Sequence, residues 1–145
     1  MIDEALTPPP SPNHISLPVQ VMYFDTDAGG VVHNIAYLRF IETARTLLAV
    51  QLGMSFDEIL RTGIHPVVVR TEIDYRRPAR LGDHLHIHGK IAEVGRVRFW
   101  VEFEITRDAD AMALVTCRQS LALVQMPEGK PLRVSEGFPS LGGTE

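Results

Sequence analysis

The stretch YFDTDAGGVVHNIAYLRFIETARTLLAVQLG, residues 23–53, changes its pattern partway along and decides the fold. Its opening, DTDAGG, combines acids with glycines and predicts a tight loop. From Asn34, the predicted N-cap, to Gly53, the predicted stop, apolar residues recur every three or four positions, which predicts one long helix. The predicted apolar face consists of Ile35, Leu38, Ile41, Ala44, Leu47 or Leu48, and Leu52.

Strands are predicted on both sides of this helix. Residues 15–23 alternate apolar and polar side chains, and Pro18 limits that strand to an edge or a start position. Downstream, the same alternation predicts a strand over residues 67–75 and a hairpin over residues 84–105 that turns near Gly95.

Two further segments complete the pattern. Ser55 and Glu58 have capping-box spacing, which predicts a short helix over residues 56–62 before Gly63. Residues 111–125 are apolar on both faces, which predicts a strand in the middle of the sheet or covered on both sides.

The predicted fold class is α+β: one strand, a long helix and then four long strands, with the helix burying its apolar face on an antiparallel sheet. A strongly curved sheet around the helix and an open two-layer sandwich satisfy these patterns equally well. We expect this domain over residues 15–126, between a flexible tail over residues 1–14 and an irregular tail over residues 127–145.

Composition narrows the class of protein. The 145 residues, 45% of them hydrophobic and 22% charged, fit one globular domain. A formal net charge of -4 without a basic stripe argues against nucleic acid as a partner, and no apolar run reaches the roughly 18 residues of a membrane-spanning helix. The acidic, proline-containing start does not resemble a signal peptide, and a single cysteine cannot form an intrachain disulfide. We therefore expect a cytoplasmic protein without membrane insertion, with Cys117 in its core.

The DTDAGG loop, directly before the long helix, is the candidate site for chemistry. The unpaired N–H groups and the positive dipole end of a helix start can hold negative charge that develops on a carbonyl oxygen. A carboxylate beside them can attack a thioester or ester carbonyl, or activate a water to do so, and Asp27 is the acid we choose. The alternative interpretation is a turn with Asx-type capping and no chemistry.

The segment YFDTDAGGVVHNIAYLRFIETAR resembles the signature of hotdog-fold acyl-CoA thioesterases related to 4-hydroxybenzoyl-CoA thioesterase and the Tol-Pal-associated thioesterases. A second segment, IDYRRPARLGDHLHI, resembles the downstream strand-turn-strand pattern of that family, so the resemblance covers roughly residues 15–125. The resemblance implies the hotdog fold, one long central helix wrapped by a curved antiparallel sheet of about five strands. It also implies hydrolysis of an acyl-CoA thioester to CoA and a free carboxylic acid, without a cofactor or a metal.

The resemblance also implies roles for particular residues. Asp27 falls on the family's catalytic carboxylate, which serves as nucleophile or general base. The backbone N–H near Asn34 falls on the oxyanion donor, with Gly30 and Val31 shaping the approach of the thioester. Asp25 occupies the first acid position, where we expect it to brace the loop through backbone hydrogen bonds.

Further along the motif, the assignments have alternatives. His33 and Asn34 depart from the family, which often has an aromatic residue followed by His or another aromatic. We assign His33 to substrate contact, with structural hydrogen bonding near the cap as the alternative. Tyr37 lies one helical turn beyond, and it either lines the same pocket or packs with its hydroxyl at the surface. Glu42 and Arg45 are better explained as an i, i+3 ion pair than as catalysts.

Coenzyme A carries phosphates, so the site needs cationic side chains at its mouth. Among the arginines we name Arg77 and Arg96 for this role. His84, His86 and His88 lie on one side of a predicted strand, where we expect a polar face rather than a metal site.

Hotdog subunits of this type resemble one another in pairing sheet edge to sheet edge, with sites between subunits, which implies a homo-oligomer, either a dimer or a tetramer. Two rivals to hydrolysis stay open. One is a hotdog dehydratase or hydratase, which typically uses a His with a helical acid. The other is a non-hydrolytic acyl-CoA-binding protein or an envelope-complex scaffold. One chain's sequence leaves open whether the acyl group is aromatic, short or long, and whether Asp27 acts covalently or as a base.

Overall fold

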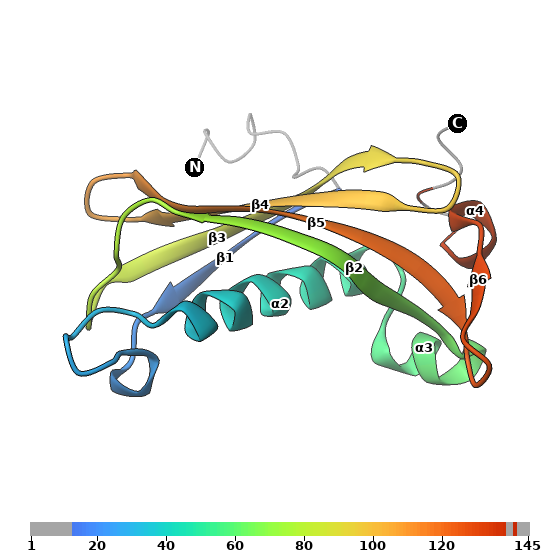
Figure 1. The fold of residues 1–145 in the computed structure, drawn as a ribbon, viewed down its shortest axis with the longest axis horizontal. Helices are drawn as coiled ribbons and strands as arrows, with labels where there is room; N and C mark the ends of the chain where they lie inside the picture. Colours follow the sequence, from blue (N-terminus) through green and yellow to red (C-terminus); the bar gives the residue numbers. More distant parts are fainter. Residues whose placement is uncertain (1–12, 139–140, 142–145) are drawn as a thin grey trace, which may run out of the picture.

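A curved antiparallel sheet wraps around one long helix in the computed structural model, which describes residues 13–138 and 141 (Figure 1). The strands are β1 (His14–Gln20), β2 (Ile64–Tyr75), β3 (His84–Val94), β4 (Phe99–Arg107), β5 (Met112–Gln125) and β6 (Lys130–Leu132). They lie side by side in the order β1-β3-β4-β5-β2, and β6 pairs with β5. The helices are the 3-10 turn η1 (Tyr23–Asp25), α2 (Asn34–Gln51), α3 (Phe56–Thr62) and α4 (Val134–Gly137). This arrangement confirms the hotdog prediction and excludes the open sandwich.

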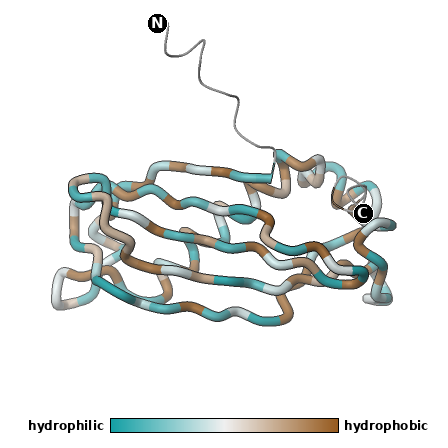
Figure 2. The backbone as a smooth tube through the Cα atoms, turned by 90° about the horizontal axis from the view of Figure 1, so that it is seen from above, coloured by the Kyte–Doolittle hydropathy of each residue, from teal (hydrophilic) through white to brown (hydrophobic). Residues whose placement is uncertain are grey.

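The strands bury one face because their side chains alternate between the two sides of the sheet. In β4 the side chains of Phe99, Val101, Phe103 and Ile105 are all buried, whereas Glu104 between them is exposed. Figure 2 shows the same alternation of hydrophobic and hydrophilic residues along the neighbouring strands. The doubly apolar β5 lies between β4 and β2, as predicted for a strand in the middle of the sheet.

The helix α2 packs on the concave side of the sheet with a face that is turned from the predicted one. Its buried residues are Ala36, Tyr37, Phe40, Ile41, Ala44 and Leu48. The prediction was wrong for Ile35, which is 63% exposed. Of the two alternatives Leu47 and Leu48, Leu48 is the buried one and Leu47 is 42% exposed. The sheet covers only one side of α2, and two alanines on that side let the backbone approach the strands closely. Apolar residues beyond that narrow stripe therefore stay at the surface.

The ends of the helices also differ from prediction at one point. His33, and not Asn34, is the N-cap of α2, because the His33 Nδ1 accepts a hydrogen bond from the Ala36 N–H at 3.2 Å. The short helix α3 is as predicted, since the Ser55 hydroxyl accepts from the Glu58 N–H.

The C-terminal segment was expected to be irregular, but it contains a short strand and a short helix. Residues 130–132 form β6 on the end of β5, and residues 134–137 form α4. Val134 and Phe138 are buried, and the Phe138 ring packs edge-on against Phe99. Elements of three and four residues are too short for a periodic pattern, which is why the sequence did not reveal them. Of the expected N-terminal tail, residues 1–12 lie outside the described residues, while His14 begins β1.

The two edges of the sheet differ. β1 is an edge strand and contains Pro18, as predicted, whereas β2 is a long edge strand that pairs, among the described residues, with β5 alone. The exposed side chains Val67, Val68 and Val69 lie on β2 beside a register shift. The first strand ends at Gln20, earlier than the predicted end at Tyr23, because Tyr23 already begins η1. No helix within residues 13–138 combines the length and apolarity needed to cross a membrane.

Candidate active site

The DTDAGG loop folds back on itself before α2 begins. The Asp27 N–H donates to the Val31 carbonyl at 3.0 Å, and the Gly30 N–H donates to the Asp27 carbonyl at 3.0 Å. Gly30 has φ +76, a left-handed conformation in which a side chain would be strained, so this turn needs a glycine. The loop therefore presents Asp27 at the edge of a tight turn.

The side chain of Asp27 is exposed. Its Oδ1 accepts a hydrogen bond from the Gly29 N–H at 2.9 Å, which is an Asx-type turn. Within the described residues, Oδ2 takes part in no hydrogen bond or ion pair. The capping and the catalytic interpretations are thus compatible, since one oxygen holds the turn and the other remains accessible.

Asp25 is in the opposite situation, because it is only 2% exposed. Its Oδ2 accepts from the Met22 N–H at 2.9 Å, and its Oδ1 accepts from the Arg39 guanidinium at 3.0 Å. The Asp25 carbonyl also accepts from the His33 N–H at 3.1 Å. This carboxylate joins the start of the loop to α2, which is the geometry that a bracing role requires.

The start of α2 lies directly after the loop. The N–H groups of Asn34 and Ile35 have no carbonyl one turn earlier within the helix, whereas Ala36 is capped by His33. The His33 Nδ1 is the acceptor in that cap, so in this geometry the ring proton is on Nε2. Backbone donors and the positive end of the helix dipole therefore lie next to the loop that carries Asp27.

The connection between β2 and β3 packs against the loop. Val31 and Arg80 form an isolated β-bridge, and the Leu81 N–H donates to the Gly30 carbonyl at 3.3 Å. The Ala79 N–H donates to the Tyr37 hydroxyl at 2.9 Å, which places that hydroxyl under the connection rather than at the surface. Burial raises the pKa of Tyr37, so the hydroxyl stays neutral.

The arginines considered for the CoA phosphates lie at opposite ends of the molecule. Arg77 and Arg80 follow β2 at the end where the loop lies, and Arg80 contacts the loop backbone directly. For the CoA phosphates we named Arg77 and Arg96 from the sequence and passed over Arg80, which was also available in the RRPARLGD turn. Arg96 lies in the turn between β3 and β4, where its carbonyl accepts from the Val134 N–H of α4, at the other end of the sheet (Figure 1).

The predicted ion pair on α2 is present. Glu42 and Arg45 are 3.3 Å apart, and the Arg45 guanidinium also donates to the Gln119 side chain on β5 at 2.7 Å. In turn, the Gln119 amide donates to the Thr71 hydroxyl on β2 at 3.2 Å. These contacts tie the middle of α2 to the sheet.

Three histidines of β1 and β3 lie together on the outer face of the sheet. The ring of His88 stacks between those of His86 and His14, with centroid distances of 6.1 Å to His86 and 6.4 Å to His14. The His86 Nδ1 is 2.7 Å from the Asp108 carboxylate. Among the residues that the structure describes, no group of three or more histidine, cysteine or acidic side chains is arranged to hold a metal ion.

Three hollows on the described part of the chain are large enough to consider, and one of them reaches Asp25 of the loop. One of about 650 Å³ lies on the outer face of the sheet, an apolar one of about 110 Å³ lies beneath the C-terminal half of α2, and a groove of about 720 Å³ runs along the exposed side of α2. None of these three is lined by Asp27. The exposed Asp27 therefore lies outside these three hollows.

Comparison with known proteins supports the resemblance. The model of the thioesterase-like superfamily matches residues 21–140. The acyl-CoA thioesterase YbgC of Haemophilus influenzae is 35% identical over 121 residues, which cover 83% of this chain and 88% of that protein. The 1,4-dihydroxy-2-naphthoyl-CoA hydrolase of Synechococcus elongatus is 30% identical over 115 residues, or 74% of this chain and 83% of that protein. Among solved structures, a probable thioesterase from Bartonella henselae has a TM-score of 0.76 and 30% identity, covering 83% of this chain and 98% of that chain.

Proposed function

The chain belongs to the thioesterase-like superfamily and is a hydrolase of acyl-CoA thioesters, and from this premise we propose that Asp27 supplies the carboxylate for hydrolysis. The observation that carries the proposal is the difference between the two acids of the loop. Asp25 is buried and paired, whereas Asp27 is exposed with one free oxygen beside the start of α2.

The reaction can take two routes that share this carboxylate. In one, Asp27 attacks the thioester carbonyl, CoA leaves as a thiolate, and water then hydrolyses the acyl-aspartyl anhydride. In the other, Asp27 removes a proton from a water that attacks the carbonyl directly. Both routes consume one water and release CoA thiol and a free carboxylic acid.

The N–H of Asn34 is our proposed donor to the carbonyl oxygen as negative charge develops there. It has no intrahelical acceptor, and the dipole of an 18-residue helix adds to its effect. Gly30 and Val31 form the wall beside it, and the lack of a side chain at Gly30 leaves room for the thioester. We propose that His33 contacts the substrate through Nε2–H, since Nδ1 is engaged in the cap. Tyr37 then acts by holding Ala79 against the loop.

We propose that two chains complete each site by pairing along β2. This strand is a long sheet edge with exposed valines, and such edges favour pairing with another strand. A two-fold axis makes the pairing antiparallel, so the Ile64 end of one β2 lies beside the Tyr75 end of the other. Pairing in this way also explains why Asp27 lines none of the three hollows described above.

The same pairing brings arginines from both ends of the molecule together. Arg77 and Arg80 of one chain lie at the Tyr75 end of β2, and Arg96 of the second chain lies at its Ile64 end. We assign these side chains to the CoA phosphates, since guanidinium groups bind phosphate through paired N–H donors.

The proposed hydrolysis needs no cofactor, because a carboxylate, backbone donors and water suffice. It includes a cytoplasmic location, where acyl-CoA is available and the lone Cys117 stays reduced.

Release of CoA thiol from benzoyl-type, short-chain and long-chain acyl-CoAs tests this function, with calorimetry of acyl-CoA binding run alongside. We expect at least one panel member to yield equal amounts of thiol and free acid. Binding without thiol release would instead indicate an acyl-CoA-binding protein. Conversion of an enoyl-CoA to a hydroxyacyl-CoA with the thioester intact would indicate a hydratase.

A further inference from the structure

The three stacked histidines on the outer face of the sheet, which we call the histidine row, lie across the seam between β1 and β3. His14 comes from β1, whereas His86 and His88 come from β3, and His88 stands between the other two rings. In the strand register His88 is opposite Ser16, and the Ser16 hydroxyl is 3.1 Å from the His88 Nδ1. The His88 ring is therefore a direct side-chain contact between the edge strand and the rest of the sheet.

The histidine row is open to water on one side. His14 and His88 both line the hollow of about 650 Å³ on the outer face, so their rings can exchange protons with solvent. The second nitrogen of His88, Nε2, is 3.2 Å from the Thr106 hydroxyl of β4. A neutral imidazole satisfies two hydroxyls by donating to one and accepting from the other, so the observed contacts suit a neutral His88.

Charged and titratable groups surround this ring unevenly. Those nearest to it are His14 of β1, His86 and Lys90 of β3, Glu102 and Glu104 of β4, and Asp108 directly after β4. Farther along the hollow are Arg118 of β5 and Glu72 and Asp74 of β2. The nearest acids all lie on the β4 side, where Glu104 is opposite His88 in the register. β1 contains no acid. A proton on His88 is therefore attracted toward β4 and meets no opposite charge on β1.

The strand β1 leads directly into the loop that carries Asp27. Just after the strand, the Val21 N–H donates to the Asp83 carbonyl at 2.9 Å. The Met22 N–H then donates to the buried Asp25 carboxylate at 2.9 Å. These two hydrogen bonds tie the end of β1 to the DTDAGG loop, so a displacement of β1 disturbs the loop as well.

We propose that the histidine row is an acid-sensitive switch: a proton on His88 releases β1 from β3 and loosens the DTDAGG loop. A proton on either neighbouring ring adds a like charge 6.1 or 6.4 Å away and strengthens the effect. Lower activity in acid is the consequence that rests on the proposed function, whereas the release of β1 does not depend on it.

The sign of the pH dependence follows from the surroundings of His88. Burial is the main cause that lowers its pKa below the ordinary 6.5 while β1 is in place. Release of β1 exposes the ring to water and returns its pKa toward the ordinary value. The released state therefore binds the proton more readily, so release becomes more favourable as pH falls below 6.5.

The test is amide hydrogen exchange of the full chain at pH 8 and pH 5, read by mass spectrometry and corrected for the chemical exchange rate at each pH. We expect the open population of residues 15–20 and 22–30 to rise at least about fivefold at pH 5, while that of β5 stays constant. In His88→Gln the rise should be less than about twofold, because the amide keeps a donor and an acceptor but gains no proton. Circular dichroism confirms that each protein is folded at both pH values.

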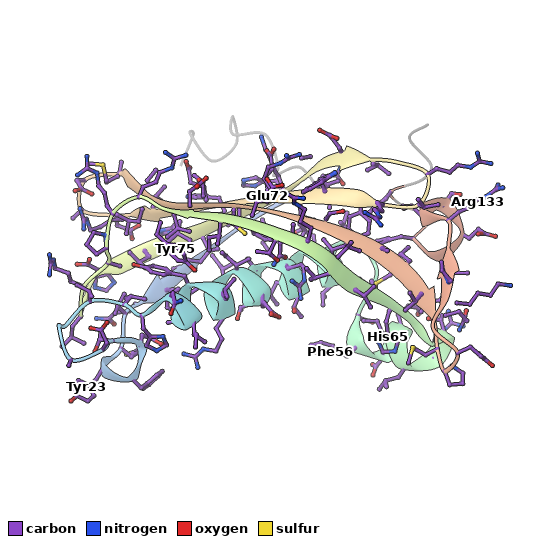
Figure 3. The ribbon with its side chains drawn as sticks, in the orientation of Figure 1. Tyr23, Phe56, His65, Glu72, Tyr75 and Arg133 are labelled. Atoms are coloured by element: carbon purple, nitrogen blue, oxygen red, sulfur yellow. The ribbon has the colours of Figure 1, made fainter. Side chains whose placement is uncertain are left out.

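His65→Gln is the matched control. His65 lies on the other edge strand, β2, near α3 in Figure 3, and is not part of the histidine row, so this variant should open like the parent. The ratio of kcat at pH 5 to kcat at pH 8 for CoA thiol release is the second measurement. We expect this ratio to be at least about threefold higher in His88→Gln than in the parent and in His65→Gln.

A parent whose β1 opens no more at pH 5 than at pH 8, or a His88→Gln that opens like the parent, would overturn the switch. Opening confined to β1, with unchanged exchange in residues 22–30 and equal kcat ratios, would overturn its link to the loop. A parent that releases no thiol at either pH defeats the proposed hydrolysis alone, because hydrogen exchange still decides whether the switch exists.

Discussion

The carboxylate of Asp25 and the guanidinium of Arg39 are 3.0 Å apart, and this ion pair joins the DTDAGG loop to the second turn of α2. It also separates the two acids of the loop by role. Asp25 has both oxygens engaged, by Arg39 and by the Met22 N–H, so it cannot approach a substrate carbonyl without leaving its partners. The exposed Asp27 has no such restriction.

The first prediction concerns this ion pair. Arg39→Ala leaves the Asp25 carboxylate buried with one backbone partner, which should lower the free energy of unfolding by about 1–3 kcal/mol. Urea unfolding followed by circular dichroism measures the change. The control is Arg61→Ala, which removes an exposed ion pair with Glu58 and should leave stability unchanged. Equal stability of Arg39→Ala and the parent would show that the pair does not brace the loop.

Tyr37→Phe is the second prediction. The substitution removes the acceptor of the Ala79 N–H, and both groups are buried, so we expect a loss of about 1–3 kcal/mol in the free energy of unfolding. Tyr75→Phe is the matched control, because Tyr75 is 47% exposed and its ring lies 5.7 Å from that of Tyr37. A loss for Tyr75→Phe as large as that for Tyr37→Phe would contradict the assigned hydrogen bond.

The third prediction concerns the only cysteine. Burial raises the pKa of the Cys117 thiol from its ordinary value of 9.0 to about 11. At pH 8 the folded protein should therefore react with a thiol reagent far more slowly than the unfolded chain in denaturant. Between pH 9 and 11 the unfolded thiol ionises while the folded one stays neutral, so this residue's contribution to stability falls as pH rises. Rapid labelling of the native protein at pH 8 would contradict its burial.

His88 gives a fourth prediction. Burial is the main cause that lowers its pKa below the ordinary 6.5, aided by His86 and His14 and opposed by Glu104 and Asp108. The unfolded chain therefore binds this proton more readily, so the stability contributed by neutral His88 is present above pH 6.5 and is lost as pH falls through the folded pKa.

Resonance-by-resonance NMR titration checks the midpoint of His88 directly. Urea unfolding of the parent and of His88→Gln at pH 8 and pH 5 checks the stability. We expect the parent to lose more stability than the variant on acidification. A His88 midpoint above 6.5 would be the opposite of what its surroundings require.

Much of the fold could be predicted because long elements repeat their pattern several times. The 18-residue α2 and the 14-residue β5 both emerged from periodicity. The buried face of α2 could not be predicted in the same way, because apolar residues cover more of the circumference of the helix than the sheet does. Ile35 and Leu47 satisfy the helical period but lie outside the contact with the strands.

The candidate site could be predicted in part. Asp27 and the start of the helix are neighbours in the sequence, so a local motif was enough to select them. The N-cap was predicted at Asn34 instead of His33 because both side chains can accept the Ala36 N–H, and only the backbone conformation decides between them. The hydrogen bond of His33 agrees with its alternative interpretation as a structural residue near the cap. Arg80 and Arg96 are separated from the loop in sequence, and their places depend on the order of the strands in the sheet, where β2 pairs with β5 and β3 pairs with β1 and β4.

The central claim is that Asp27 carries the chemistry, and the rate of CoA thiol release by Asp27→Asn tests it most directly. The asparagine oxygen can still accept from the Gly29 N–H, so the variant keeps the turn and loses only the negative charge. Asp57→Asn, at an exposed acid in the first turn of α3, is the matched control and should behave like the parent. We predict that folded Asp27→Asn still binds acyl-CoA but loses at least about a hundredfold in kcat. If it keeps more than about a tenth of the parent rate, Asp27 is not the catalytic carboxylate.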